Sequence, residues 1–190
     1  PQNPKTPGTE YCNLLLLNMN YKIAAVLALT ATKAYADKCY ALAFSSGDQS
    51  SAYQAGVLKG LIQAHGASET AYSAVSGVSG GGVNAALLGS FTVGQETSAA
   101  ERMITFWQNT TTNKLYKDWI GGIVEGLTVK PGLYNDALLQ TFLEGELADI
   151  GSMQRFVDVG ITDVIKGSFH DNTETLNTNL VDVIFASFSY

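Results

Sequence analysis

The chain has 190 residues, 46% of them hydrophobic and 15% charged, with a formal net charge of −6. This length and composition suit one folded domain with its own core and argue against a disordered or repeat protein. The acidic balance and the lack of a basic cluster exclude nucleic acid as an expected partner, and they disfavour tight binding to anionic membranes.

The first 36 residues are predicted to precede the folded domain, which spans 37–190. Residues 1–18 lack an initiator Met and are rich in turn residues, so this upstream segment is of doubtful origin. Residues 19–36 have the order of a secretory signal peptide: a positive charge, an apolar run too short to span a bilayer, and the cleavage site Ala34-Tyr35-Ala36. The open alternatives are a buried helix and an uncleaved anchor. We expect a secreted or secretory-pathway protein, whose single remaining cysteine, Cys39, leaves no internal disulfide.

The domain is predicted to begin with a strand and a helix. Residues 40–44 are a short apolar run that ends at Ser45-Ser46-Gly47-Asp48, which indicates a buried strand leading into a loop. A helix then follows, with Ser50 or Ser51 as its N-cap and Gly66 as its stop signal. Its apolar residues Tyr53, Val57 and Leu61 recur every four positions.

The most informative segment comes next, where an apolar strand over 71–75 leads into Gly77-Val78-Ser79-Gly80-Gly81 and an Ala/Leu-rich helix over 83–88. Gly-x-Ser-x-Gly between a strand and a helix is typical of a nucleophile elbow, whose tight turn exposes the serine hydroxyl. Ser79 would then lie at a helix N-terminus, where free N–H groups stabilise the negative charge of an attacked ester. The alternative is a flexible glycine-rich turn. A phosphate-binding P-loop fits poorly, because no Lys-Ser or Lys-Thr pair follows the glycines.

Two core helices are expected further on, within 97–108 and from Asn135 onward. Between them, residues 116–134 are rich in glycine and aromatic residues, which indicates a loop-rich excursion over the sheet. This excursion either covers an acyl-chain cleft or is an ordinary connection. The single N-glycosylation sequon, at Asn109, is expected in a Thr-rich loop and fits a secreted protein.

The last part of the chain predicts a strand with one buried face. Residues 156–161 and 163–165 alternate apolar and polar side chains, and a polar turn is expected at 171–174. The apolar stretch 181–186 then runs into 187–190 with no closing helix, so we expect the chain to stop inside its domain.

Three segments of this sequence together resemble the patatin-like phospholipase family, and the likeness covers most of residues 39–190. They are a glycine-containing loop after the first strand (41–48), the run Ala-Tyr-Gln-Ala-Gly-Val-Leu (52–58), and the elbow with its helix (76–85). The resemblance implies an α/β fold of three layers, with a mostly parallel central sheet flanked by helices. It also implies a lipid acyl hydrolase that needs no cofactor.

By this resemblance Ser79 is the nucleophile of a Ser-Asp dyad, and an acyl-enzyme forms during the reaction. The backbone of Ser46, Gly47 and Asp48 is expected to donate to the oxyanion. The expected partners are a phospholipid or other acyl lipid and, transiently, a membrane or micelle interface.

The sequence departs from the family in two places. The family loop has a run of glycines, then Arg or Lys, then Gly, whereas this chain has Asp48, Ser50 and Ser51 in that loop. Non-glycine residues resist positive φ, and a carboxylate near an oxyanion opposes its charge, so we expect weakened activity. The family's dyad aspartate lies in an Asp-Gly-Gly or Asp-Gly-Ala turn, and this sequence contains none. The base is then expected beyond Tyr190, and these residues alone are expected to be nearly inactive.

Two other functions remain open. The first is a Ser-His-Asp esterase in which Ser79 is followed by Asp158 or Asp163 and then by His170. The second is a secreted lipid-binding pseudoenzyme that keeps the cleft and has lost efficient catalysis. A metal enzyme is disfavoured, because two distant histidines and no Cys-x-x-Cys spacing provide no ligand set.

Overall fold

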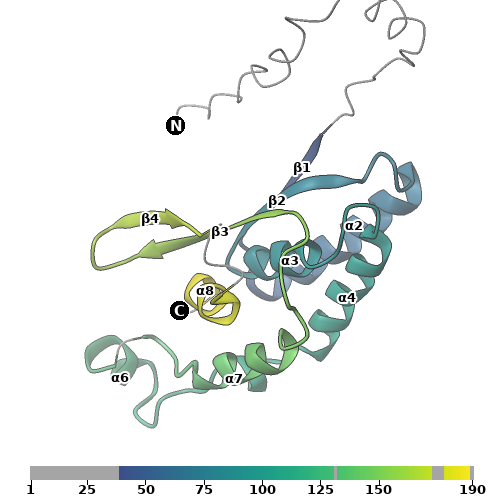
Figure 1. Ribbon diagram of the computed structural model, residues 1–190. Coiled ribbons are helices and arrows are strands. Elements are labelled where there is room, and N and C mark those ends of the chain that lie inside the picture. Colours follow the sequence, from purple (N-terminus) through teal and green to yellow (C-terminus); the bar gives the residue numbers. More distant parts are fainter. Residues whose placement is uncertain (1–38, 131, 173–177, 189–190) are drawn as a thin grey trace, which may run out of the picture. The chain divides into compact units, whose positions relative to one another are not determined.

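The computed structural model describes residues 39–130, 132–172 and 178–188 (Figure 1). The predictions about the upstream segment (1–18) and the signal peptide (19–36) lie outside the described residues and stay predictions. None of the helices in the described ranges combines the length and hydropathy that crossing a membrane requires.

A four-stranded sheet with the order β1-β2-β3-β4 forms the centre of residues 39–190. Its strands are β1 (Tyr40–Phe44), β2 (Tyr72–Val78), β3 (Phe156–Asp163) and β4 (Ser168–Asp171). β1 pairs with β2 and β2 with β3 in parallel, whereas β4 returns antiparallel to β3. Parallel neighbours require crossover connections, which helices supply here (Figure 1). The predicted α/β fold with a mostly parallel sheet is confirmed.

The four helices expected from the sequence, those after Ser50 or Ser51, over 83–88, within 97–108 and from Asn135 onward, are present, and the described residues form further helices that were not expected. Their bounds are η2 (Asp48–Ser50), α2 (Ser51–His65), α3 (Gly80–Gly89), α4 (Glu96–Asn109), α5 (Thr112–Leu115), α6 (Gly122–Thr128), α7 (Ala137–Glu146) and α8 (Leu180–Phe188). One detail of α2 differs from a simple amphipathic helix, because Tyr53 is 77% exposed while Ala55 and Leu58 are buried. The stripe that revealed this helix therefore lies on its outer face, where it borders a groove beside β1.

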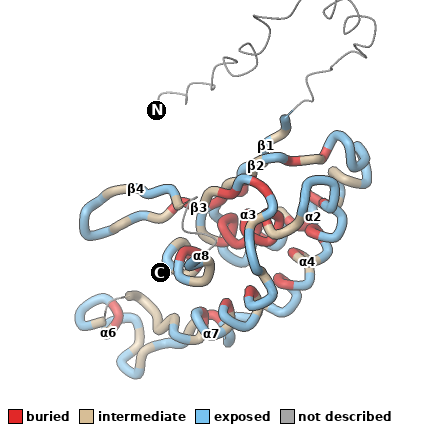
Figure 2. The backbone as a smooth tube through the Cα atoms, viewed as in Figure 1, coloured by how far each residue is buried: buried red, intermediate tan, exposed pale blue. Residues whose placement is uncertain are grey.

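The helix that follows the elbow is the centre of the core. All ten residues of α3 are buried, and α3 contacts β1, β2 and β3 on one side and α2, α4 and α8 on the others (Figure 2). The small side chains of its glycines and alanines let the sheet and the neighbouring helices approach its backbone closely. The sheet buries Val75, Val157 and Val159 against this layer, whereas Val78 and Phe156 are 40% and 58% exposed. The described residues thus contain the sheet and one helical layer of the expected three-layer fold.

Two expectations about the C-terminal part are wrong. The strand expected at 163–165 is interrupted, because the chain reverses at 164–167, where Asp163 accepts hydrogen bonds from the N–H groups of Ile165 and Lys166 and Gly167 adopts a φ of +63°. Val164 and Ile165 therefore lie in an exposed hairpin turn, and Asp171 lies on β4. The polar turn expected at 171–174 lies partly outside the described residues and stays a prediction. The last apolar stretch forms the helix α8, which buries Val183, Ile184 and Phe188.

A buried ion pair joins Arg155, which directly precedes β3, to Glu96, the first residue of α4. Arg155 Nη1 lies 2.8 Å from Glu96 Oε1, and neither side chain is more than 1% exposed. The guanidinium also donates to the carbonyls of Phe91, Thr92 and Tyr72, at 2.7–2.9 Å, while Glu96 Oε2 accepts from Gly94 N–H. Burial and the nearby Glu96 carboxylate raise the pKa of Tyr72. Arg155 therefore provides hydrogen-bond donors both to the first carbonyl of β2, at Tyr72, and to the loop carbonyls of Phe91 and Thr92.

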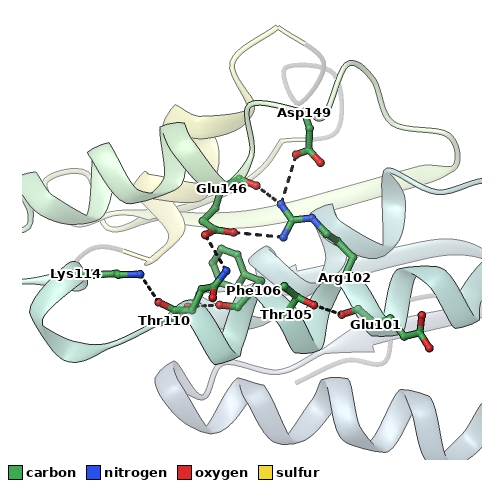
Figure 3. Close-up of polar contacts among 9 residues, drawn as sticks. Glu101, Arg102, Thr105, Phe106, Thr110, Lys114, Glu146 and Asp149 are labelled. Carbon is green, nitrogen blue, oxygen red and sulfur yellow. Dashed lines mark hydrogen bonds and ion pairs between the residues drawn. The ribbon is translucent and has the colours of Figure 1, made fainter.

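A second polar network, between α4 and the end of α7, is partly exposed (Figure 3). Arg102 pairs with the Glu146 carboxylate at 3.4 Å, donates to the Glu146 carbonyl and reaches Asp149 at 3.5 Å. Asn109, which donates to Glu146, is the last residue of α4 rather than part of the loop. Its side chain is exposed, so glycosylation there stays a prediction that this position permits.

Candidate active site

Ser79 is the single residue between the end of β2 and the start of α3. Its φ of 56° and ψ of −130° are strained for a residue with a side chain. Asp48, with a φ of 46°, is the other non-glycine residue at positive φ in the described ranges. Such strain concentrates at functional sites, and these two residues lie in the elbow and in the predicted oxyanion loop.

Close backbone contacts hold the elbow against the β1–α2 loop. A Cβ added at Gly77 would overlap the Gly81 carbonyl, and one added at Gly81 would lie 2.5 Å from the carbonyl oxygens of Phe44 and Ser45. The glycines of the motif are therefore required by the approach of β1, β2 and α3. This is the packing that the Gly-x-Ser-x-Gly pattern predicts.

Gly81→Ala is expected to destabilise the protein by about 3 kcal/mol, because two carbonyl oxygens must move to admit the methyl group. The matched control is Gly56→Ala in α2, where a Cβ meets nothing within 4 Å and a neutral or slightly stabilising effect is expected. Urea unfolding followed by circular dichroism measures both. Equal stability of the two variants would contradict the close contact at Gly81.

The predicted oxyanion loop, 46–48, lies against the N-terminus of α3. A Cβ at Gly80 would lie 2.9 Å from the Asp48 carbonyl oxygen and would overlap Ser51 Oγ. In the first turn of α3 the N–H groups of Gly82 and Val83 bond to the Ser79 carbonyl. The N–H groups of Gly80 and Gly81 precede the first hydrogen bonds within the helix. Such N–H groups at a helix N-terminus can bind an anion. The structure thus brings the loop and the elbow together.

Ser187 on α8 is a site residue whose contacts sequence reasoning missed. Its hydroxyl accepts a hydrogen bond from Ser79 N–H at 2.8 Å and donates to the Gly160 carbonyl at 2.7 Å. One hydroxyl therefore connects the elbow, β3 and α8. The Ser79 N–H is engaged by this bond, which leaves the following amide, of Gly80, as the elbow's donor. No local spacing signal relates Ser187 to Ser79, because the two residues are 108 positions apart in the sequence.

A cavity of about 260 Å³ borders the oxyanion loop. Loop residues 47–50 form one wall, and apolar and aromatic side chains form much of the rest: Leu115, Tyr116, Tyr134, Leu139 and Phe188, together with Asp136. The rings of Tyr116 and Tyr134 lie 4.8 Å apart, so the two ends of the 116–134 excursion meet at this cavity. Ser79 is not among the lining residues. The excursion's ends border the cavity, whereas its helix α6 exposes Val124 and Leu127.

The residues of the predicted Ser-His-Asp alternative are engaged within the β3–β4 hairpin. His170, on β4, is exposed and lies 2.9 Å from the Ser168 hydroxyl. Asp158 accepts from Asn172 N–H. Hydrogen bonds from backbone N–H groups, first that of Lys166, lower the pKa of Asp163. None of these contacts reaches Ser79. Across the described ranges, no three His, Cys, Asp or Glu side chains group closely enough to hold a metal ion.

A serine at positive φ between a parallel strand and a buried helix, with a tight loop against its turn, defines the nucleophile-elbow class of α/β proteins. The family model described as patatin-like phospholipase matches residues 42–190. The chain therefore belongs to the patatin-like phospholipase family, as its motifs predict. At the level of the family it is a lipid acyl hydrolase with lipid substrates. A search of curated proteins found no match.

Proposed function

We propose that this protein is a secreted serine acyl hydrolase in which Ser79 attacks the ester carbonyl of a phospholipid or another acyl lipid. The observation that carries the proposal is the strained φ of Ser79 at the elbow, with the 46–48 loop packed against the next residue, Gly80. The signal-like residues 19–36 and the exposed sequon at Asn109 support secretion.

The proposed reaction proceeds through an acyl-enzyme. The Ser79 hydroxyl gives its proton to a base as its oxygen bonds to the ester carbon, and the oxyanion accepts hydrogen bonds from backbone N–H groups of Gly80 and the 46–48 loop. The alcohol then leaves with that proton, and water releases the fatty acid. The base is the aspartate of a Ser-Asp dyad, which we place beyond Tyr190 because no Asp-Gly-Gly or Asp-Gly-Ala turn occurs here.

The altered loop predicts that Asp48→Gly increases kcat by about fivefold to tenfold. Glycine adopts the φ of 46° without the cost of about 1 kcal/mol that a side chain imposes, and the substitution removes a carboxylate from the loop. Asp48→Asn separates the two causes, because it removes the charge and keeps the side chain. Ester hydrolysis by the three proteins measures the effect. An Asp48→Gly protein no faster than wild type would show that the loop conformation does not limit catalysis.

The lipid-binding pseudoenzyme remains a second candidate because of one observation. Ser51 Oγ, on the first residue of α2, is buried without a hydrogen-bond partner among the described residues, in the segment where the sequence departs from the family's glycine-rich pattern. The full-length protein should therefore be mixed with phosphatidylcholine vesicles and with a p-nitrophenyl ester. Release of fatty acid and nitrophenol supports the hydrolase, whereas vesicle binding without release supports the pseudoenzyme.

A further inference from the structure

One side chain of α2 holds the start of the oxyanion loop. Gln54 Nε2 donates to the Ser45 carbonyl at 2.8 Å and lies 3.1 Å from the Ser45 hydroxyl. Ser45 directly precedes the 46–48 loop, and its carbonyl oxygen is one of the two atoms that exclude a Cβ at Gly81. Gln54 therefore holds the peptide that sets how far the loop stands from the N-terminus of α3.

The orientation of the Gln54 amide is fixed from the protein core. Trp107 Nε1–H donates to Asn84 Oδ1 at 2.7 Å, and an indole N–H can only donate. The Asn84 amide must then present its NH₂ group on the other side, where it donates to Gln54 Oε1 at 2.8 Å and to the Ser51 carbonyl at 2.9 Å. With its oxygen engaged, Gln54 has its NH₂ group left for Ser45.

We propose that Gln54 is a positioning residue for the oxyanion loop, and that Trp107 and Asn84 orient the Gln54 NH₂ group toward the Ser45 carbonyl. Asn84 is fully buried in α3 and Trp107 is 8% exposed in α4, so the relay Trp107–Asn84–Gln54 runs from the core to the site. The proposal rests on the proposed function, because it assumes that the loop donates to the oxyanion. Since the oxyanion exists only after attack, loss of the relay lowers kcat and leaves KM nearly unchanged.

The test compares Gln54→Glu, Gln54→Ala and the control Gln63→Ala in the full-length protein. Gln63 is a glutamine on the exposed face of the same helix. The Gln54→Glu carboxylate still accepts from Asn84 but cannot donate to the Ser45 carbonyl. We expect both Gln54 variants to lower kcat about tenfold to a hundredfold, with KM within about twofold of wild type. The control changes neither constant.

The pH profile separates positioning from a general loss of structure. A protonated carboxyl group can donate to the Ser45 carbonyl, so the ratio of Gln54→Glu to wild-type kcat should rise as pH falls toward about 4.3. The ratio for Gln54→Ala should stay constant. A Gln54→Glu ratio that does not change with pH, or a rise in KM at constant kcat, would overturn the proposal.

Amide hydrogen exchange tests the relay without relying on activity. Exchange of the 45–50 segment should increase about tenfold in both Gln54 variants, while β3 exchanges as in wild type. Unchanged exchange of 45–50 would overturn the positioning role. If wild type hydrolyses no ester, the proposed function fails, and the exchange result alone decides whether Gln54 positions the loop.

Discussion

Ser79→Ala is expected to reduce ester hydrolysis by on the order of ten-thousand-fold or more, to the rate of a site that binds substrate without a nucleophile. The hydroxyl is the group that forms the acyl-enzyme, and no other side chain occupies the turn between β2 and α3. Stability should change little, because Ser79 donates to Ser187 on α8 through its backbone N–H, which the substitution keeps. Hydrolysis of a p-nitrophenyl ester by the full-length protein measures the loss.

The matched control for this variant is Ser73→Ala. Ser73 lies on the same strand, β2, and is exposed, so its hydroxyl is expected to contribute to neither activity nor packing. Wild-type rates for this control and background rates for Ser79→Ala would assign the loss to the elbow serine. Comparable rates for Ser79→Ala and wild type would show that another group is the nucleophile.

Arg155→Met is expected to destabilise the protein by about 3–5 kcal/mol. The substitution leaves the Glu96 carboxylate buried without its cation, with the hydrogen bond from Gly94 N–H still in place, and it removes donors from three backbone carbonyls. A loss of this size approaches the total stability of many domains. Glu96→Gln, which keeps Arg155 and its carbonyl contacts, provides a milder variant whose unfolding can be measured. Urea denaturation compares both variants with wild type.

The control for this pair lies in the partly exposed network of Figure 3. Asp149 is 69% exposed and lies 3.5 Å from Arg102, so Asp149→Asn is expected to change stability by less than about 1 kcal/mol. Arg155→Met no more destabilising than Asp149→Asn would contradict the burial of the Arg155–Glu96 pair.

The elbow was predictable because its information is local. A strand, a Gly-x-Ser-x-Gly turn and a small-residue helix follow one another within about 20 residues, and each element has its own spacing signal. The strain at Asp48 was also foreseeable, since the resemblance places glycine in that loop. Its φ of 46° agrees with the expectation that a side chain there is unfavourable.

The remaining contacts of the site depend on residues far apart in the sequence. Ser187 is 108 residues from Ser79, Gln54 is 30 from Asn84, and Arg155 is 59 from Glu96. No spacing rule relates such positions, so a serine, a glutamine or an arginine in the sequence gives no sign of its partner. A local turn also overrode the strand propensity of Val164 and Ile165, because the Asp163 carboxylate accepts from the Ile165 and Lys166 N–H groups and Gly167 adopts a positive φ.

The most direct measurement is the site of covalent labelling by a fluorophosphonate, which reacts with activated serine nucleophiles. The full-length protein would be labelled, digested and examined by mass spectrometry, with Ser79→Ala treated in parallel. We expect a single modified serine, Ser79, and no labelling of the variant. Modification at another residue, or a wild-type protein that takes up no label, would contradict the claim that Ser79 is the nucleophile of this patatin-like protein.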